Sequence, residues 1–185
     1  MNHLELAKRL VGRSRKRGAD QAEAFLEAGR DASCRVRDGE IEDLSQATSK
    51  GVGLRVFSKK RMGFAYTSDF SPSSLDALVD RAVALAKSAA PNPLNGLPNR
   101  KELAGAAARR DRGGLFDDQV ASLPPDWKIA AALEMEKAGK AVDRRITTFE
   151  SVGAGETVSE AFLASSEGFA GELHGGLEAA KALGK

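Results

Sequence analysis

The spacing of apolar residues changes along the chain and predicts its elements in order. The first apolar positions recur at helical spacing: Leu4, Ala7, Leu10 and Val11. They predict a helix over residues 2–17, which Gly18 ends. Over residues 20–67 apolar and polar residues alternate with a period of two, and turn signals stand at Asp38-Gly39 and at residues 58–61. This part predicts several short strands, joined by tight turns into an antiparallel sheet.

A second helix is predicted near residues 72–90. Ser71 can cap its first turn and Pro72 suits its first position, where no backbone N–H is needed. Its apolar residues form one stripe: Leu75, Leu78, Val79, Ala82, Val83, Ala86 and Ala89. We expect both helices to cover the sheet, which gives an α+β N-terminal domain over residues 1–90.

The rest of the chain has a different organisation. Residues 91–125 are rich in Pro, Ala, Arg and Gly, and we interpret them as a long connection with one helical turn. A further helix is expected from Asp126, as its cap, to about residue 142. Residues 145–152 and 156–165 alternate again around a glycine-containing turn at 152–155, which predicts a second hairpin. Residues 126–171 would thus start a second domain, and 172–185 form an atypical alanine-rich tail.

Composition narrows the class of protein. The 185 residues are 42% hydrophobic and 29% charged, with a formal net charge of +2, so bulk charge gives no case for nucleic acid. The chain lacks an apolar stretch long enough to span a bilayer, and its first residues lack the apolar core of a signal peptide. Its single cysteine, Cys34, excludes an internal disulfide. We therefore expect a cytoplasmic protein without membrane contact.

The glycine pairs do not fit a phosphate-binding loop. A dinucleotide fingerprint needs a third glycine three residues after the second, but Val56 follows Gly53 and Val158 follows Gly155 at that spacing. No Gly-Lys-Ser/Thr sequence is present either. Strand ends and turns explain both pairs better.

Catalytic motifs are absent from the sequence as well. The imidazole and thiol ligands are His3, His174 and Cys34, and no HExxH or paired-cysteine pattern joins them. We interpret His3 as a frayed terminal histidine and Cys34 as a packed residue of a strand. No GxSxG or SxxK pattern occurs. Glu23 and Glu27 are most simply residues of a solvent-facing strand surface. We predict no catalytic, cofactor-binding or metal-binding residue in this chain.

The sequences of several segments, and their order along the chain, resemble the TldD/PmbA family. Members of this family are described as metalloproteases and, by older naming, as modulators of DNA gyrase. The resemblance is carried by "GADQAEAFLEAG", by "VRDGEIEDLSQATSKGVGLRVFSKKRMGFAYTSDFSPSSLDALVDRAVALAKSAAPNPLNGLP" and by "DRRITTFESVGAGETVSEAFLASSEGFAG". These segments span most of residues 18–171. The residues Leu115-Phe116-Asp117 and 143–147 are more similar to the PmbA (TldE) branch.

The resemblance implies the N-terminal portion of a peptidase subunit. In the family, a PmbA-type subunit pairs with a TldD-type subunit whose HExxxH motif holds the metal, expected to be zinc, and the complex acts on peptides. This sequence has no HExxxH. The resemblance therefore implies a non-metal-binding partner that is not active alone, with a TldD-type subunit and a peptide as partners and a homo-oligomer as a further possibility. The surface formed by residues 51–67 is our candidate for docking a partner or a peptide strand.

A different class of function stays open beside this one. Basic residues cluster at Arg13, Arg15, Lys16 and Arg17 and again at residues 109–112. They could belong to a nucleic-acid or gyrase-associated regulatory protein. A solvated helix end explains the first cluster more simply, because no aromatic residue for base stacking lies among these cations. We therefore expect no nucleic-acid partner.

Overall fold

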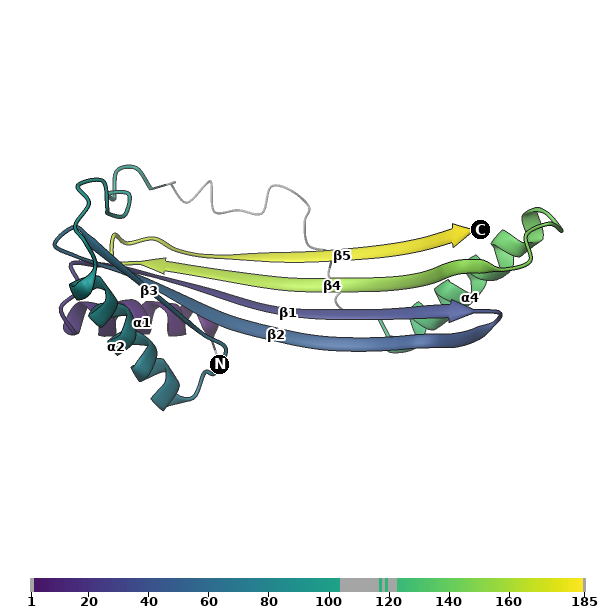
Figure 1. Cartoon of the computed structure of the whole chain (residues 1–185), viewed down its shortest axis with the longest axis horizontal. Helices are drawn as coiled ribbons and strands as arrows, with labels where there is room; N and C mark the ends of the chain where they lie inside the picture. Colours follow the sequence, from purple (N-terminus) through teal and green to yellow (C-terminus); the bar gives the residue numbers. More distant parts are fainter. Residues whose placement is uncertain (1, 104–116, 118, 120–122, 185) are drawn as a thin grey trace. The chain divides into compact units, whose positions relative to one another are not determined.

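The computed structural model describes residues 2–103, 117, 119 and 123–184 (Figure 1). Its helices in these residues are α1 (His3–Lys16), α2 (Pro72–Ser88) and α4 (Pro125–Val142). Its strands are β1 (Gln21–Arg37), β2 (Glu40–Ser58), β3 (Arg61–Thr67), β4 (Phe149–Ser165) and β5 (Ala170–Gly184). The described strands form one antiparallel sheet in the order β3-β2-β1-β4-β5. The predicted α+β class is confirmed.

The chain divides into two compact units. The first comprises the described residues within Met1–Ala28, Ser49–Asp111 and Glu160–Leu173, and the second those within Gly29–Thr48, Arg112–Ser159 and His174–Lys185. Strands β1, β2, β4 and β5 contribute residues to both units. Each unit has a hydrophobic cluster of its own, so each is described separately below.

The first unit packs two helices on strands. The side chain of Asn2 caps α1 by accepting a 3.0 Å hydrogen bond from Glu5 N, and Gly18 follows the helix with a φ of 97°. Ser71 caps α2, and α2 packs against β3. Alternate residues of the strands face these helices in a shared core: Ala22, Ala24, Leu26, Val52, Leu54, Val56 and Ala65 are buried there with Leu6, Leu10, Leu78, Val79 and Ala82. The two predicted helices are thus confirmed.

The predicted turn between β2 and β3 is also confirmed. The two strands pair from Val52↔Thr67 to Ser58↔Arg61. Lys59 and Lys60 form the turn with φ angles of 51° and 62°. Lys59 N donates a 2.6 Å hydrogen bond to Asp20 Oδ2, which fixes the turn against the start of β1.

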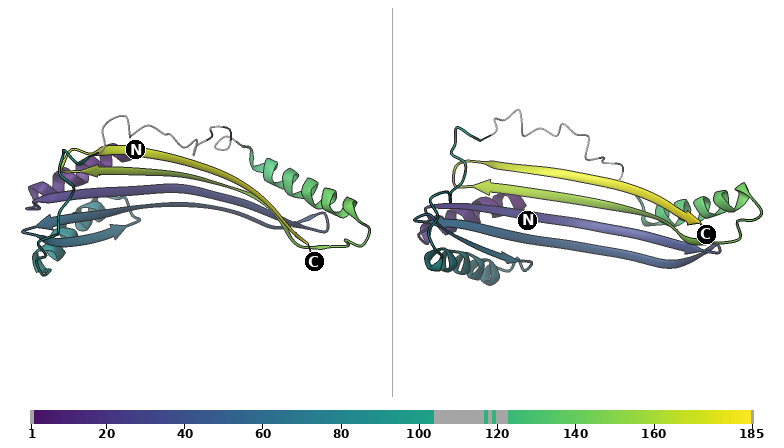
Figure 2. Two further views of the ribbon diagram at one scale, coloured as in Figure 1. Left: turned by 90° about the horizontal axis from the view of Figure 1, so that it is seen from above. Right: turned by 45° about the horizontal axis from the view of Figure 1, so that its top comes forward.

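The second unit packs α4 on parts of β1 and β4 (Figure 2). Its buried residues are Cys34, Val36, Ala132, Phe149, Val152 and Ala154, with Trp127, Ile129 and Leu133 packed against them. The predicted turn at Asp38-Gly39 joins β1 to β2, with φ angles of 52° and 81° at those two residues. Positive φ at both positions is the geometry that an Asp-Gly pair favours in a two-residue hairpin loop.

The strands are longer than the sequence predicts. We expected several short strands, but β1, β2, β4 and β5 have 17, 19, 17 and 15 residues. The expected second hairpin with a turn at residues 152–155 is wrong, because β4 runs unbroken through that segment. Gly153 lies where a Cβ atom would stand 2.8 Å from Cys34 O, so this glycine permits a close backbone approach rather than a turn.

The turn after β4 lies further along the chain. Ser165 N donates to Phe169 O at 2.9 Å, and Gly168 has a φ of 91°. The chain then returns as β5, so residues 172–184 of the expected tail belong to a strand. Helix α4 begins at Pro125 after Pro124, and Asp126 lies in its first turn rather than at the cap position. The helical turn expected in the connection over 91–125 falls largely outside the described residues.

Candidate functional surfaces

The candidate surface at residues 51–67 is built from glycines and aromatic rings. Gly53 is paired with Tyr66, and Arg55 with Phe64, across β2 and β3. A Cβ atom at Gly53 would lie 3.1 Å from the Phe64 ring, and one at Gly51 would overlap the Tyr66 ring. The two glycines therefore leave room for aromatic rings to lie across β2. Phe64 and Tyr66 stay more than half exposed, at 54% and 59%.

A shallow groove of about 370 Å³ lies on this surface. Its lining consists of Glu23, Phe25, Gly53, Arg55, Met62 and Phe64. In the groove, Arg55 Nη2 and Glu23 Oε1 form a 2.6 Å ion pair. The two charged residues of the lining therefore compensate each other. The lining offers apolar contact and a satisfied ion pair. It contains no nucleophile beside a base and no set of metal ligands.

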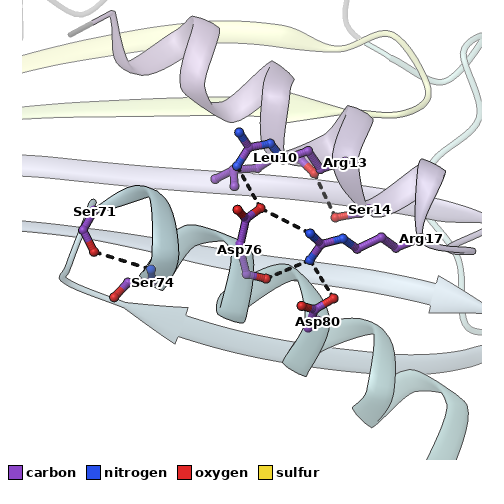
Figure 3. Close-up of polar contacts among 8 residues, drawn as sticks. All are labelled: Leu10, Arg13, Ser14, Arg17, Ser71, Ser74, Asp76 and Asp80. Carbon is purple, nitrogen blue, oxygen red and sulfur yellow. Dashed lines mark hydrogen bonds and ion pairs between the residues drawn. The ribbon is translucent and has the colours of Figure 1, made fainter.

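The basic cluster at the end of α1 is largely used to hold two helices together. Arg13 Nη1 lies 3.2 Å from Asp76 Oδ1, and Arg17 Nη1 lies 2.6 Å from Asp80 Oδ1 (Figure 3). Arg17 also donates to the backbone oxygen of Asp76 at 2.9 Å. Arg15 and Lys16 are exposed. Two of the four cations therefore join α1 to α2, and the second cluster at residues 109–112 lies outside the described residues.

A buried carboxylate lies in the second unit, between α4 and the strands. The side chain of Glu156 on β4 is 2% exposed. Its Oε1 accepts from Arg30 Nη2 at 2.9 Å, and its Oε2 lies 3.4 Å from Lys128 Nζ. Lys128 is itself buried on α4. Since a carboxylate stripped of water requires compensating charge, Arg30 and Lys128 supply the cations that the buried side chain of Glu156 needs.

A second buried carboxylate joins α4 to the β1–β2 turn. Glu136 accepts backbone hydrogen bonds from Asp38 N at 2.7 Å and from Gly39 N at 2.8 Å, one on each carboxylate oxygen. Lys140 Nζ lies 2.9 Å from Asp38 Oδ1 and 3.2 Å from Glu136 Oε1. Burial alone raises the pKa of Glu136, but the hydrogen bonds from Gly39, Lys140 and Asp38 outweigh it and hold the pKa below its ordinary value.

The residues considered as metal ligands or nucleophiles lie on different elements: His3 in α1, Cys34 in β1 and His174 in β5. The interpretation of His3 as frayed is wrong, because its ring makes edge contacts with Phe70 and Phe162 at 6.0 and 5.2 Å between centroids. Cys34 is buried in the second unit. Its burial and, to a smaller extent, the negative charge of the nearby Asp43 raise the pKa of its thiol. Within residues 2–103 and 123–184, no three side chains of His, Cys, Asp or Glu converge on a point that could hold a metal ion. The described residues therefore do not fit a zinc site.

The two buried carboxylates were not among the residues singled out from the sequence. Glu136 and Lys128 lie four residues to either side of buried Ala132, and this spacing puts all three on one face of α4. Charged residues on the apolar face of a helix were the available signal. Their partners, Asp38 and Glu156, are distant in sequence, so the pairs became visible only in the fold.

In a comparison with known families, two segments match successive domains of one family. Residues 22–86 match the domain described as PmbA/TldA metallopeptidase domain 1, and residues 118–175 match the PmbA/TldA metallopeptidase central domain. The chain is 30% identical over 132 residues to Metalloprotease PmbA of Escherichia coli O157:H7. It is 29% identical over 119 residues to the Metalloprotease PmbA homolog of Haemophilus influenzae. These alignments cover 71% and 64% of this chain but only 28% and 25% of the relatives.

Solved structures show the same fold. The chain superposes on TldE from Thermococcus kodakarensis with a TM-score of 0.78 at 19% identity, covering 96% of this chain and 39% of that one. It superposes on a Bacteroides thetaiotaomicron protein, named as a candidate modulator of DNA gyrase, with a TM-score of 0.74 at 23% identity, covering 94% and 39%. Among the described helices, none is both long and apolar enough to cross a membrane.

Proposed function

Because the chain belongs to the PmbA/TldD family, of whose members it spans the first and central domains, we propose that it acts as a PmbA-type subunit without a metal of its own. Its role is to pair with a TldD-type subunit that carries the HExxxH zinc motif. The pair processes or degrades peptides. The observation that carries the proposal is the succession of two domains of one metallopeptidase family, together with the similarity to relatives named PmbA.

The surfaces of the first unit support a docking role rather than a chemical one. The groove between Phe25 and Phe64 offers exposed apolar contact, and its Glu23–Arg55 pair is already satisfied. Exposed aromatic residues are the anchors that protein interfaces favour. We propose the zinc in the TldD-type partner, as the family resemblance implies.

The test is a peptidase assay on the chain with and without a TldD-type subunit. The chain alone should bind no zinc by elemental analysis and should leave an unfolded protein substrate intact. Addition of the TldD-type subunit should give cleavage that a chelator abolishes. Chelator-sensitive cleavage by the chain alone would refute the proposed division of labour. A complex that cleaves at the same rate as the TldD-type subunit alone would refute the subunit role.

A regulatory protein that binds DNA or gyrase is the second candidate, favoured by the name of the Bacteroides relative and by the exposure of Arg15 and Lys16. Such binding should weaken steeply with salt, since cations on phosphates release counterions. A gel-shift titration of the chain with Arg15 and Lys16 replaced by Ala decides this reading. DNA binding that is unaffected by that change would count against the regulatory role.

The cytoplasmic location stays a prediction.

A further inference from the structure

The part of β2 in the second unit has an open outer edge. Strand β3 pairs only with Val52–Ser58, whereas β2 begins at Glu40. In the described part of the chain, no strand lies outside residues 40–48 of β2 (Figure 1). An edge of this kind presents a row of N–H and C=O groups that can pair with another strand.

The side chains of this edge are also uncovered. Within residues 40–48 only Asp43 is partly buried, and all the others are exposed. Ile41 and Leu44 are exposed at 49% and 59%. The segment contains no proline and no lysine, two residues that commonly protect an edge against pairing. Two of its three acidic residues, Glu42 and Asp43, form ion pairs with Arg37 and Arg35 of the neighbouring strand β1. Its open edge and its exposed apolar residues together favour a partner strand.

We propose that residues 40–48 of β2 pair with the same residues of a second copy of this chain, antiparallel and about a two-fold axis at Leu44. In this register Leu44 faces Leu44 of the second copy, and Ile41 faces Ala47. The acidic residues face neutral polar ones: Glu40 faces Thr48, Glu42 faces Gln46 and Asp43 faces Ser45. Such an isologous contact closes at two copies.

The neighbouring registers are less favourable, and this is what identifies a second copy as the occupant. In an antiparallel pair that keeps the corresponding faces of the two sheets on one side, the two-fold axis passes through a residue. The next possible register moves this axis by one residue along the strand. An axis at Asp43 would oppose two Asp43 carboxylates, and like charges placed directly opposite are destabilising. An axis at Ser45 would oppose Leu44 to Gln46. The strand is therefore self-complementary in one register, in which apolar residues meet and acidic residues do not.

The first test is cross-linking of a Leu44→Cys variant in a Cys34→Ser background. At the axis the two Cα atoms would be about 4.5–5.5 Å apart, which is within disulfide range. The matched control is Leu85→Cys in the same background, because Leu85 is similarly exposed, at 47%, but lies on α2. Under mild oxidation the Leu44→Cys variant should form a covalent dimer well before the Leu85→Cys variant. Equal rates for the two variants would overturn the proposal.

The second test needs no cysteine and uses the full chain. Light scattering over a concentration series should show a species of twice 19.5 kDa. Leu44→Lys, which puts two cations at the axis, should raise the dimer dissociation constant at least about tenfold, whereas Leu85→Lys should leave it unchanged. A monomer at all concentrations, or a dimer indifferent to Leu44→Lys, would overturn the proposal. A chain that is a monomer but still binds a TldD-type subunit would overturn this strand-pairing proposal and leave the proposed function intact.

Discussion

Replacement of Glu136 by Gln should destabilise the second unit far more than the same change at an exposed position of α4 would. The change keeps the shape of the side chain and removes its charge. Both oxygens of Glu136 accept a backbone hydrogen bond from the Asp38-Gly39 turn. The amide of Gln has only one acceptor oxygen, so one of the two N–H groups would face an NH₂ group instead.

The magnitude follows from these two bonds. A hydrogen bond to a charged group contributes about 1.5–3 kcal/mol. Loss of one bond and weakening of the other should lower the free energy of unfolding by roughly 2–4 kcal/mol at pH 7. For a chain of this size that corresponds to a fall in Tm of roughly 5–15 °C.

The assay is urea unfolding followed by the fluorescence of Trp127, the only tryptophan, which packs against the core of the second unit. Glu134→Gln is the matched control, since Glu134 lies on the same helix but is exposed. The control should stay within about 0.5 kcal/mol of the wild type. If the two variants are equally stable, the carboxylate at Glu136 does not hold the turn.

The pH dependence supplies an independent check. The pKa of Glu136 lies below its ordinary value of 4.5 in the folded chain. Its contribution is therefore complete above the unfolded value and is lost as the pH falls through the folded one. The difference between wild type and Glu136→Gln should stay constant from neutral pH down to about pH 5 and shrink below that. A difference that widens on acidification would contradict the assigned sign.

Four further predictions concern the packing of the units. Gly12→Ala should stabilise the chain by about 0.5–1 kcal/mol, because an added Cβ on α1 meets nothing within 4 Å and alanine favours a helix. Gly153→Val should destabilise the chain by about 1–3 kcal/mol through contact with Cys34 O. A change of stability in the opposite direction for either variant, measured by urea unfolding, would refute the backbone geometry. Asp76→Asn should cost about 0.2–1 kcal/mol, because its ion pairs with Arg13 and Arg17 are half exposed; a larger loss would mean that α1 depends on them. Cys34 should react with a thiol reagent only after urea unfolding, since it is buried with a raised pKa; rapid labelling of the native chain would contradict its burial.

The helices were predictable because their signals are local. Ser71 and Pro72 mark the start of α2, and the turns at Asp38-Gly39 and Lys59-Lys60 stand where the sequence placed them. The extent of the strands was not predictable in the same way. Gly153 in β4 carries the signature of a turn, yet it serves the close approach of β4 to Cys34 O on a neighbouring strand. A glycine that allows a turn and a glycine that allows close packing look alike in a single sequence.

The candidate surfaces were predictable in part. Residues 51–67 do contain a hairpin that exposes Phe64 and Tyr66 on one face, but no local pattern indicated that Phe64 would lie across Gly53. The buried carboxylates were missed because each depends on a residue far along the chain. Glu136 contacts a turn 97 residues earlier, and Arg30 and Glu156 are 126 residues apart. Only the fold brings such charges together, and only burial makes them consequential.

Native mass spectrometry of the tagged chain, isolated from its own cells, tests the central claim most directly. The claim is that this chain is a metal-free subunit of a two-chain peptidase. It predicts a complex that contains this chain together with an HExxxH-bearing chain, with zinc lost only when the second chain dissociates. Zinc that stays with this chain after dissociation, or complexes that contain no HExxxH-bearing chain, would contradict the claim.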